Sequence, residues 1–229
     1  MNDGRSYFHQ LAVKLEKRLS NGLQFFANFS YSRPMSETAI LNAGSLALAK
    51  QVASGDRPIY VSVSAIHDLP VGKGRSYLAN TNRVAMFLLG NWQVGATYTY
   101  FPCAPLGFGG VFYRGGPLHY NASNPNGPRF DTAQFIAASA QRLSNSFRTF
   151  PPNFSNLRID STNDFNVNPT KNFTVYGDVK LQFRAESCDA ANRPPFESPN
   201  MTVTATTFGT IASATNVPRA IQLARRPTF

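Results

Sequence analysis

YFHQLAVKLEKRLSNGLQFFANFSYSR, the stretch from residue 7 to residue 33, decides the fold because apolar and polar side chains alternate along it. Between residues 11 and 15 every second side chain is apolar, and charged side chains stand between and after them. The charged residues are Lys14, Glu16 and Arg18. Because successive side chains of a β-strand point to opposite faces, the pattern predicts a strand with one apolar and one polar face.

A tight turn follows at Ser20-Asn21-Gly22, where Asn and Gly tolerate the positive φ that a short hairpin connection requires. The alternation resumes at Leu23 and continues to Tyr31, with apolar side chains mainly at the odd positions. The stretch therefore predicts a hairpin of two long antiparallel strands.

Five further segments have the features of strands. They lie at about 57–69, 92–101, 157–175, 179–186 and 218–229. A short helix is expected at about 83–89, inside the connection that precedes Trp92. Most of the predicted strands are long, and tilted transmembrane strands need about 9–11 residues whereas strands of soluble proteins usually have about 5 or 6. Strand length therefore favours a membrane protein.

The composition agrees with a sheet that has one apolar face. Charged residues make up 15% of the chain and aromatic residues 13%, whereas soluble domains carry about 25% charged residues. The mean hydropathy is −0.24 and no run of about 18 apolar residues occurs. Transmembrane barrels escape hydropathy analysis because membrane-facing and lumen-facing residues alternate along each strand.

Several function classes are disfavoured by the positions of the reactive residues. The formal charge of +10 comes from Lys and Arg scattered along the chain, so we expect no nucleic-acid partner. The three His residues are dispersed, and Cys103 and Cys188 lack the paired spacing of a zinc site. No nucleophile elbow occurs either. We expect no catalytic residues, no metal site, no cofactor and no enzymatic activity.

The connections between the predicted strands alternate in length. Those at residues 20–22 and 176–178 are short, whereas 34–56, 104–156 and 191–217 are long. Outer-membrane barrels have short periplasmic turns and long extracellular loops. The segment at about 104–156, rich in Gly, Pro, Asn and Ser, is therefore expected to be a long extracellular loop. The connection 70–91, with its short helix, is the exception to the alternation.

Several segments resemble one known family, and they occur in the same order along nearly the whole chain. They are 7–33, HDLPVGKG at 67–74, LGNWQV at 89–94, YFPCAPLGFG at 100–109, FDTAQF at 130–135, 179–199 and 208–223. These segments are similar to the barrel of TonB-dependent receptors that carry an N-terminal carboxypeptidase-regulatory-like domain.

The resemblance implies an all-β fold in which residues 1–229 form the C-terminal portion of an antiparallel transmembrane β-barrel. About seven long strands would belong to a plugged barrel of roughly 22 strands. It implies the outer membrane of a Gram-negative bacterium and the uptake or binding of a bulky substrate such as a glycan or peptide. The implied partners are outer-membrane lipid, the barrel-insertion machinery and TonB. TonB would be contacted only through N-terminal parts, because no signal peptide and no plug domain are recognised in this sequence.

Three sets of residues carry the expected roles. Lumen-facing polar residues are Lys14, Glu16, Arg18, Lys180, Arg184 and Glu186. Membrane-interface aromatic residues are Phe29, Tyr31, Trp92, Tyr98 and Tyr100. The C-terminal signal for barrel insertion is formed by Ile221, Leu223 and Phe229.

Three residues depart from this pattern and leave two alternatives open. Arg225 and Pro227 stand at positions expected to face lipid, and Pro169 interrupts a predicted strand. An Arg on the lipid face costs about 2–4 kcal/mol at the midplane and far less near the interface. The alternatives are a soluble all-β interaction module, whose apolar face would need a second sheet, and a non-functional gene fragment.

Overall fold

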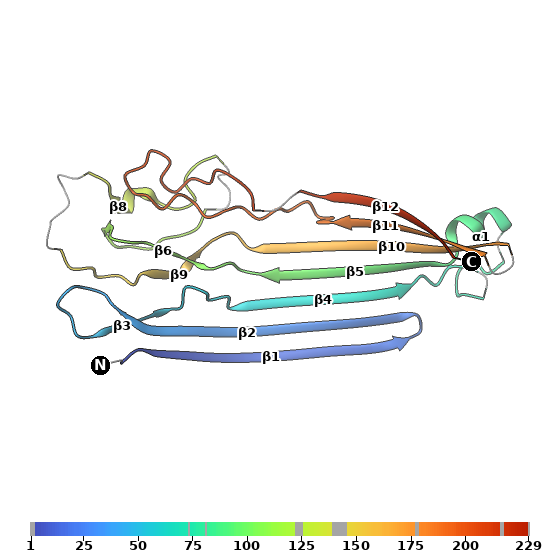
Figure 1. The fold of residues 1–229 in the computed structure, drawn as a ribbon, viewed down its shortest axis with the longest axis horizontal. Helices are drawn as coiled ribbons and strands as arrows, with labels where there is room; N and C mark the ends of the chain where they lie inside the picture. Colours follow the sequence, from blue (N-terminus) through green and yellow to red (C-terminus); the bar gives the residue numbers. More distant parts are fainter. Residues whose placement is uncertain are drawn as a thin grey trace.

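A computed structural model of the chain describes residues 3–72, 74–80, 82–121, 126–138, 146–176, 179–215 and 218–228. Long strands lie side by side in a single layer and run along the longest axis of the molecule (Figure 1). The long strands are β1 Arg5–Ser20, β2 Leu23–Ile40, β4 Ile59–Asp68, β5 Trp92–Phe101, β10 Thr162–Tyr176, β11 Val179–Cys188 and β12 Ala220–Thr228.

The long strands form a meander in which each strand pairs antiparallel with its neighbours in the order β1-β2-β4-β5-β10-β11-β12. β3 Leu48–Val52 pairs with the distal end of β2 and completes an eight-stranded sheet over the described residues. β1 and β12 each pair with one neighbour among the described strands, so the sheet is open at both edges. An all-β antiparallel sheet with seven long strands was predicted, and it is confirmed.

Two predicted boundaries differ from the structure. The first hairpin is longer than the alternation indicated, because its strands start at Arg5 and end at Ile40. The strand predicted at 157–175 is divided into β9 Asn153–Arg158 and β10, since β9 leaves the main sheet and pairs with β6 Pro105–Gly107. Leu157 in β9 is fully buried in the loops, and its apolar side chain resembled the start of a membrane strand in the sequence.

The register places the apolar and polar sets on opposite faces of the sheet. Residues paired directly across neighbouring strands point to the same face. One row across five strands is Leu15, Ala27, Val63, Tyr98 and Phe165. The row beside it is Lys14, Asn28, Ser62, Thr99 and Asp164. We call the first side of the sheet the apolar face and the second the polar face.

The connections lie at the two ends of the sheet, and the long connections gather at one end, except for 69–91, which lies at the same end as the short turn at residues 21–22 (Figure 1). The turn at residues 21–22, the connection 69–91 and the end of β12 lie at one end, which we call the short-turn end. The connection 69–91 contains the helix α1 Arg83–Leu89, at the position predicted from the sequence. The long connections lie at the opposite end, which we call the loop end. None of the described helical segments is long and apolar enough to cross a membrane.

The long connections form a packed layer with its own core, which the sequence did not predict. They contain β6, β7 Phe112–Tyr113, η1 Thr132–Gln134, β8 Phe135–Ile136 and β9. The buried side chains are Leu106, Phe108, Leu118, Phe130, Phe135, Phe150, Leu157, Val203 and Phe208. The Phe108 ring centroid lies 4.6 Å from that of Phe135 and 5.5 Å from that of Phe130. The described residues of the segment expected as one long loop therefore pack together, with part of 191–217, in a layer that we call the loop layer.

Candidate functional site

The charged residues expected in the lumen lie on or near the polar face. Lys14 Nζ is 3.3 Å from Glu16 Oε2, and Arg184 Nη2 is 2.5 Å from Glu186 Oε1. Lys14 Nζ also lies 5.0 Å from the centroid of the Phe26 ring on the neighbouring strand. Lys14, Glu16 and Arg184 are exposed and Glu186 is partly exposed, so these ion pairs contribute little to stability.

The two remaining members of the predicted lumen set are placed less uniformly. Lys180 pairs with Thr228 in the polar phase of β11, at the short-turn end. Arg18 is exposed but lies in the register shift between Lys17 and Ser20, so the ladder does not assign it to a face. The structure therefore places five of the six residues on the polar face, on strands far apart in the sheet.

Neutral hydroxyl and amide groups fill the polar face between these charged groups. They include Asn28, Ser62, Ser64, Thr97, Thr99, Asn166 and Asn168. Each of these side chains donates and accepts hydrogen bonds without carrying a charge. Asp164 of β10 also lies on this face, where its carboxylate accepts a hydrogen bond from Asn166 Nδ2 at 2.7 Å. The centre of the polar face is therefore rich in neutral hydrogen-bonding groups and includes this carboxylate toward the loop end.

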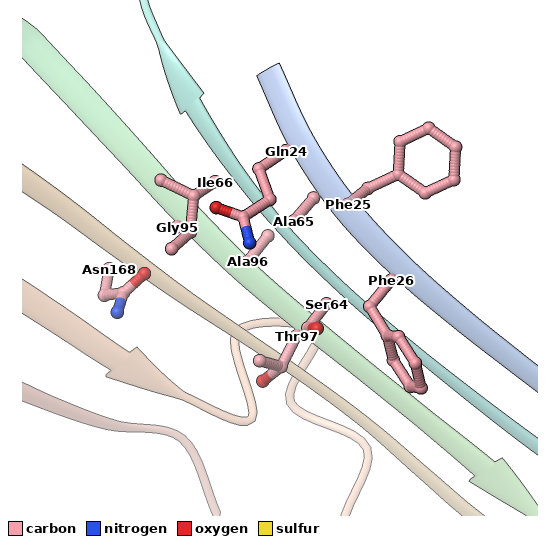
Figure 2. Close-up of a pocket in the computed structure, with 10 residues that line it drawn as sticks. All are labelled: Gln24, Phe25, Phe26, Ser64, Ala65, Ile66, Gly95, Ala96, Thr97 and Asn168. Atoms are coloured by element: carbon pink, nitrogen blue, oxygen red, sulfur yellow. The ribbon is translucent and has the colours of Figure 1, made fainter. Parts of the chain in front are cut away.

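A shallow hollow of about 200 Å³ lies in this central region (Figure 2). Its surface is mainly apolar, with Phe26 and Ile66 among the lining residues, and its polar lining residues are Gln24, Ser64, Thr97 and Asn168. Gly95 makes room for the Asn168 side chain opposite, because a Cβ at position 95 would overlap that side chain. This hollow did not stand out in the sequence, since a single Gly inside an alternating strand carries no signal of what lies across from it.

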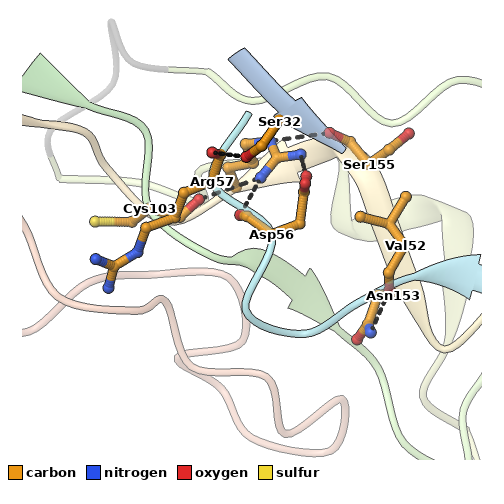
Figure 3. A network of polar contacts seen from close by, with 8 residues as sticks. Ser32, Val52, Asp56, Arg57, Cys103, Asn153 and Ser155 are labelled. Atoms are coloured by element: carbon orange, nitrogen blue, oxygen red, sulfur yellow. Dashed lines mark hydrogen bonds and ion pairs between the residues drawn. The ribbon is translucent and has the colours of Figure 1, made fainter. Parts of the chain in front are cut away.

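A buried ion pair ties the loop layer to the ends of the strands (Figure 3). Arg158 Nη2 contacts Asp56 Oδ2, and the two side chains are 18% and 3% exposed. Arg158 Nη1 also donates to the carbonyl oxygens of Asp56, at 2.8 Å, and of Cys103, at 3.3 Å. One guanidinium therefore joins the connection before β4, the chain after β5 and the strand β9.

A second arginine, Arg148, connects segments inside the loop layer by hydrogen bonds to their carbonyl oxygens. Arg148 donates from Nη1 to the Gly109 carbonyl at 2.8 Å and from Nη2 to the Phe108 carbonyl at 2.6 Å. Its backbone N–H donates to Asn42 Oδ1 at 2.6 Å, and Asn42 Nδ2 donates back to the Arg148 carbonyl at 3.0 Å. Burial lowers the pKa of the Arg148 guanidinium from its ordinary value. The pair Arg148 and Asn42 connects two loops that are far apart in the sequence.

The aromatic residues expected at the membrane interfaces all lie on the apolar face. Phe29, Tyr31, Tyr98 and Tyr100 are toward the loop end, and Trp92 is at the short-turn end. Eight steps of about 3.3 Å lead from Trp92 to Tyr100, or roughly 26 Å along the strand; at the tilt of about 35–45° usual in outer-membrane barrels this spans about 20 Å across the membrane, slightly less than the apolar band of about 25 Å. The aromatic groups therefore stand near the two limits of a band of membrane thickness.

The last strand carries the apolar residues of the expected insertion signal. Ile221 and Leu223 lie on the apolar face and are 68% and 66% exposed. Phe229 lies outside the described residues. Arg225 pairs with Phe183 and Pro227 with Leu181, so both departures do fall on the apolar face, toward the short-turn end.

Pro169 interrupts the hydrogen-bonding pattern less than the sequence suggested. It stays inside β10, paired with Val94 of β5, and the strand continues on either side of it. On the other side, the ladder with β11 has no partner at Asn168 or Pro169. The missing N–H is therefore accommodated by a local gap in one ladder.

Lys171 is the residue that the sequence analysis missed. It stands in the apolar phase of β10, opposite Trp92, and is 2% exposed. Its Nζ donates to the carbonyl oxygens of Leu88, at 3.1 Å, and Gly90, at 2.5 Å. The sequence did hold a sign of this unusual position, because Lys171 is a cation where the alternation requires an apolar side chain.

The comparison with protein families gives one match that covers most of the chain. Residues 1–222 match the family described as "Outer membrane beta barrel domain". No curated protein and no solved structure matches the chain. An apolar face with aromatic residues at both limits, a polar opposite face and loops of unequal length at the two ends are the features of such barrels. The chain belongs to the outer membrane beta barrel domain family, and its place is the outer membrane of a Gram-negative bacterium.

Proposed function

We propose that this chain forms the C-terminal strands of a TonB-dependent outer-membrane receptor that captures a bulky substrate and admits it through the barrel. The observation that carries the proposal is the ordered loop layer, which stands at one end of a sheet whose polar face is lined with neutral hydrogen-bonding groups. A receptor needs both features, since the loops select the substrate and the lumen lets it pass.

The loop layer is suited to recognition because it is held in one arrangement before any ligand arrives. Nine buried side chains form its core, and Arg148 and Arg158 connect its segments to each other and to the strands. A preorganised surface loses less conformational entropy on binding than a flexible loop does. This supports a binding role for the loop layer.

The soluble alternative is disfavoured by the apolar face. Leu11, Val13 and Leu15 are each more than half exposed on β1, as are Ile221 and Leu223 on β12. A sandwich would bury such side chains against a second sheet, and the described residues include no second sheet of comparable size. Lipid is the environment that suits this face.

Energy coupling through TonB is supported by the resemblance of the sequence segments, and uptake assays test it. Cells that display the protein in the outer membrane would be given labelled oligosaccharides and labelled peptides, with and without an intact TonB system. We expect surface binding in both strains and accumulation only where TonB is intact and the proton gradient is present. Accumulation that persists without TonB would contradict the proposal and would indicate a passive channel.

A loop variant links the binding signal to the loop layer. Arg158→Met removes the buried guanidinium that joins three segments, so surface binding should fall while the amount of barrel in the membrane is retained. Arg184→Met on the exposed polar face of β11 is the matched control and should leave surface binding unchanged. Equal binding by both variants would argue against recognition by the loop layer.

A further inference from the structure

The helix α1 differs from the other described connections at the short-turn end because its outer surface is apolar. Val84, Phe87 and Leu88 are 68%, 59% and 58% exposed. Their spacing of three and four residues places them on one side of the helix. The sequence of α1, RVAMFLL, contains no acidic residue, and its only charged residue is Arg83.

The position of α1 makes this surface continuous with the apolar face of the sheet. The Phe87 ring centroid lies 4.9 Å from that of Phe173, and Trp92 Nε1 donates to the Leu88 carbonyl at 2.9 Å. Phe173 and Trp92 both lie in the apolar phase of their strands. The exposed side of α1 therefore extends a surface that faces lipid in an outer-membrane barrel.

Lys171 fastens the C-terminal end of α1 to the sheet. Its ammonium reaches the carbonyl oxygens of Leu88 and Gly90, which belong to the end of the helix where carbonyls lack partners within the helix. The same ammonium lies 5.2 Å from the Trp92 ring and 5.1 Å from the Phe173 ring. A cation at this end also offsets the negative end of the helix dipole. These hydrogen bonds and cation–π contacts stabilise the charged ammonium of Lys171 inside the apolar face, and they orient α1.

We propose that α1 is an interfacial helix whose side chains Val84, Phe87 and Leu88 insert among the acyl chains of phospholipids in the periplasmic leaflet. Amphipathic helices lie in the interface with their apolar side buried about 5–10 Å. The short-turn end is the periplasmic end of such barrels. Arg83 is exposed beside the apolar stripe, where it reaches the level of the anionic headgroups.

Phospholipid fits this surface better than a periplasmic protein does. The surface of α1 adjoins the apolar face at Phe173 and Trp92, so a docked protein would have to displace lipid from the neighbouring strands. The helix enlarges the membrane-facing surface, and the contacts of Lys171 and Trp92 with its C-terminal end fix its position along the strands. Its role would be to fix the depth of these strands in the bilayer, which goes beyond the proposed uptake function.

Fluorescence quenching in proteoliposomes tests the proposal. Cys103 and Cys188 are first replaced by Ser, and single cysteines are introduced as Phe87→Cys, Val13→Cys and Lys180→Cys for labelling with an environment-sensitive nitrobenzoxadiazole group. Val13 is an exposed residue of the apolar face, and Lys180 is on the polar face at the same end as α1. The vesicles contain phosphatidylethanolamine and phosphatidylglycerol, with a nitroxide on a fraction of the acyl chains.

The account predicts that the label at position 87 is quenched by nitroxide lipid to the extent seen at position 13, and is protected from aqueous iodide. The label at position 180 should show the reverse. Quenching at 13 but not at 87 would overturn the interfacial role of α1 and leave the membrane assignment intact. Absence of lipid quenching at both positions would overturn the membrane-facing assignment as well.

Discussion

Lys171 occupies a position in β10 where the alternation calls for an apolar side chain. A charge in lipid is costly unless it is paired or reaches the interface. Here the ammonium has two carbonyl acceptors and two aromatic rings, and it stands near the short-turn end of the strand. The position is therefore tolerated because a neighbouring element supplies the partners.

Replacing Lys171 with Met should loosen α1 without disturbing the strands. Met keeps the approximate length of the side chain but removes the donor, and a buried acceptor left without a partner costs about 1–3 kcal/mol. Hydrogen exchange at residues 83–90 should become faster, while exchange in β5 and β10 stays slow. Lys171→Arg, which retains the charge and the donors, is the control. Unchanged exchange in the Met variant would show that Lys171 does not hold the helix.

The Asp56 and Arg158 pair has a larger expected effect because both side chains are largely buried. Removing one partner of a buried ion pair costs about 3–5 kcal/mol, since the other charge is left without compensation. Arg158→Met should make the extracellular loops sensitive to protease added to intact cells. The double variant Asp56→Asn with Arg158→Met should recover part of the resistance, because no charge remains buried. A double variant as sensitive as the sum of the two single variants would exclude direct coupling.

Among the elements, those whose side chains follow a regular period were predicted from the sequence. Seven long strands and a short helix at about 83–89 were expected from the sequence, and the structure has both. The loop layer was missed because its buried Phe residues have no period that indicates a strand or helix. Arg158 and Asp56 are separated by 102 positions, so no local pattern connects them. Lys171 interrupts the alternation of β10 in the sequence itself, but its partners Leu88 and Gly90 belong to another part of the chain, so the sequence did not indicate what the cation contacts.

The last strand offers a paired test of the two faces. Arg225 lies on the apolar face opposite Phe183, and Arg226 lies on the polar face opposite Gln182. An Arg on the lipid face costs about 2–4 kcal/mol at the midplane and about 0–1 near the interface. Arg225→Leu should therefore raise the free energy of unfolding by urea in lipid vesicles, by up to about 4 kcal/mol depending on the depth of position 225. Arg226→Leu should give no gain, and an equal gain from both variants would contradict the assignment of faces.

On the scale of the whole molecule, the described strands form a sheet that is open at both edges and apolar on one side. Open edges present unpaired N–H and C=O groups, which associate with other chains in water and are not tolerated in lipid. In the receptor proposed above, further strands would supply the partners for β1 and β12.

This chain purified alone should therefore aggregate in detergent-free buffer, and detergent should reduce the aggregation by covering the apolar face. Analytical ultracentrifugation with and without detergent checks this expectation. A stable monomer in plain buffer would favour the soluble all-β module instead.

The central claim is that the apolar face meets lipid and the polar face meets water. Nitroxide spin labels placed one at a time at residues 180 to 186 of β11, in the protein embedded in a bilayer, test it most directly. Collision rates with oxygen, which concentrates in lipid, and with a water-soluble nickel complex are then compared at each position. The account predicts a period of two, with oxygen favoured at Leu181, Phe183 and Ala185 and nickel favoured at the positions between them. Absence of the alternation, or nickel access at the odd positions, would contradict it.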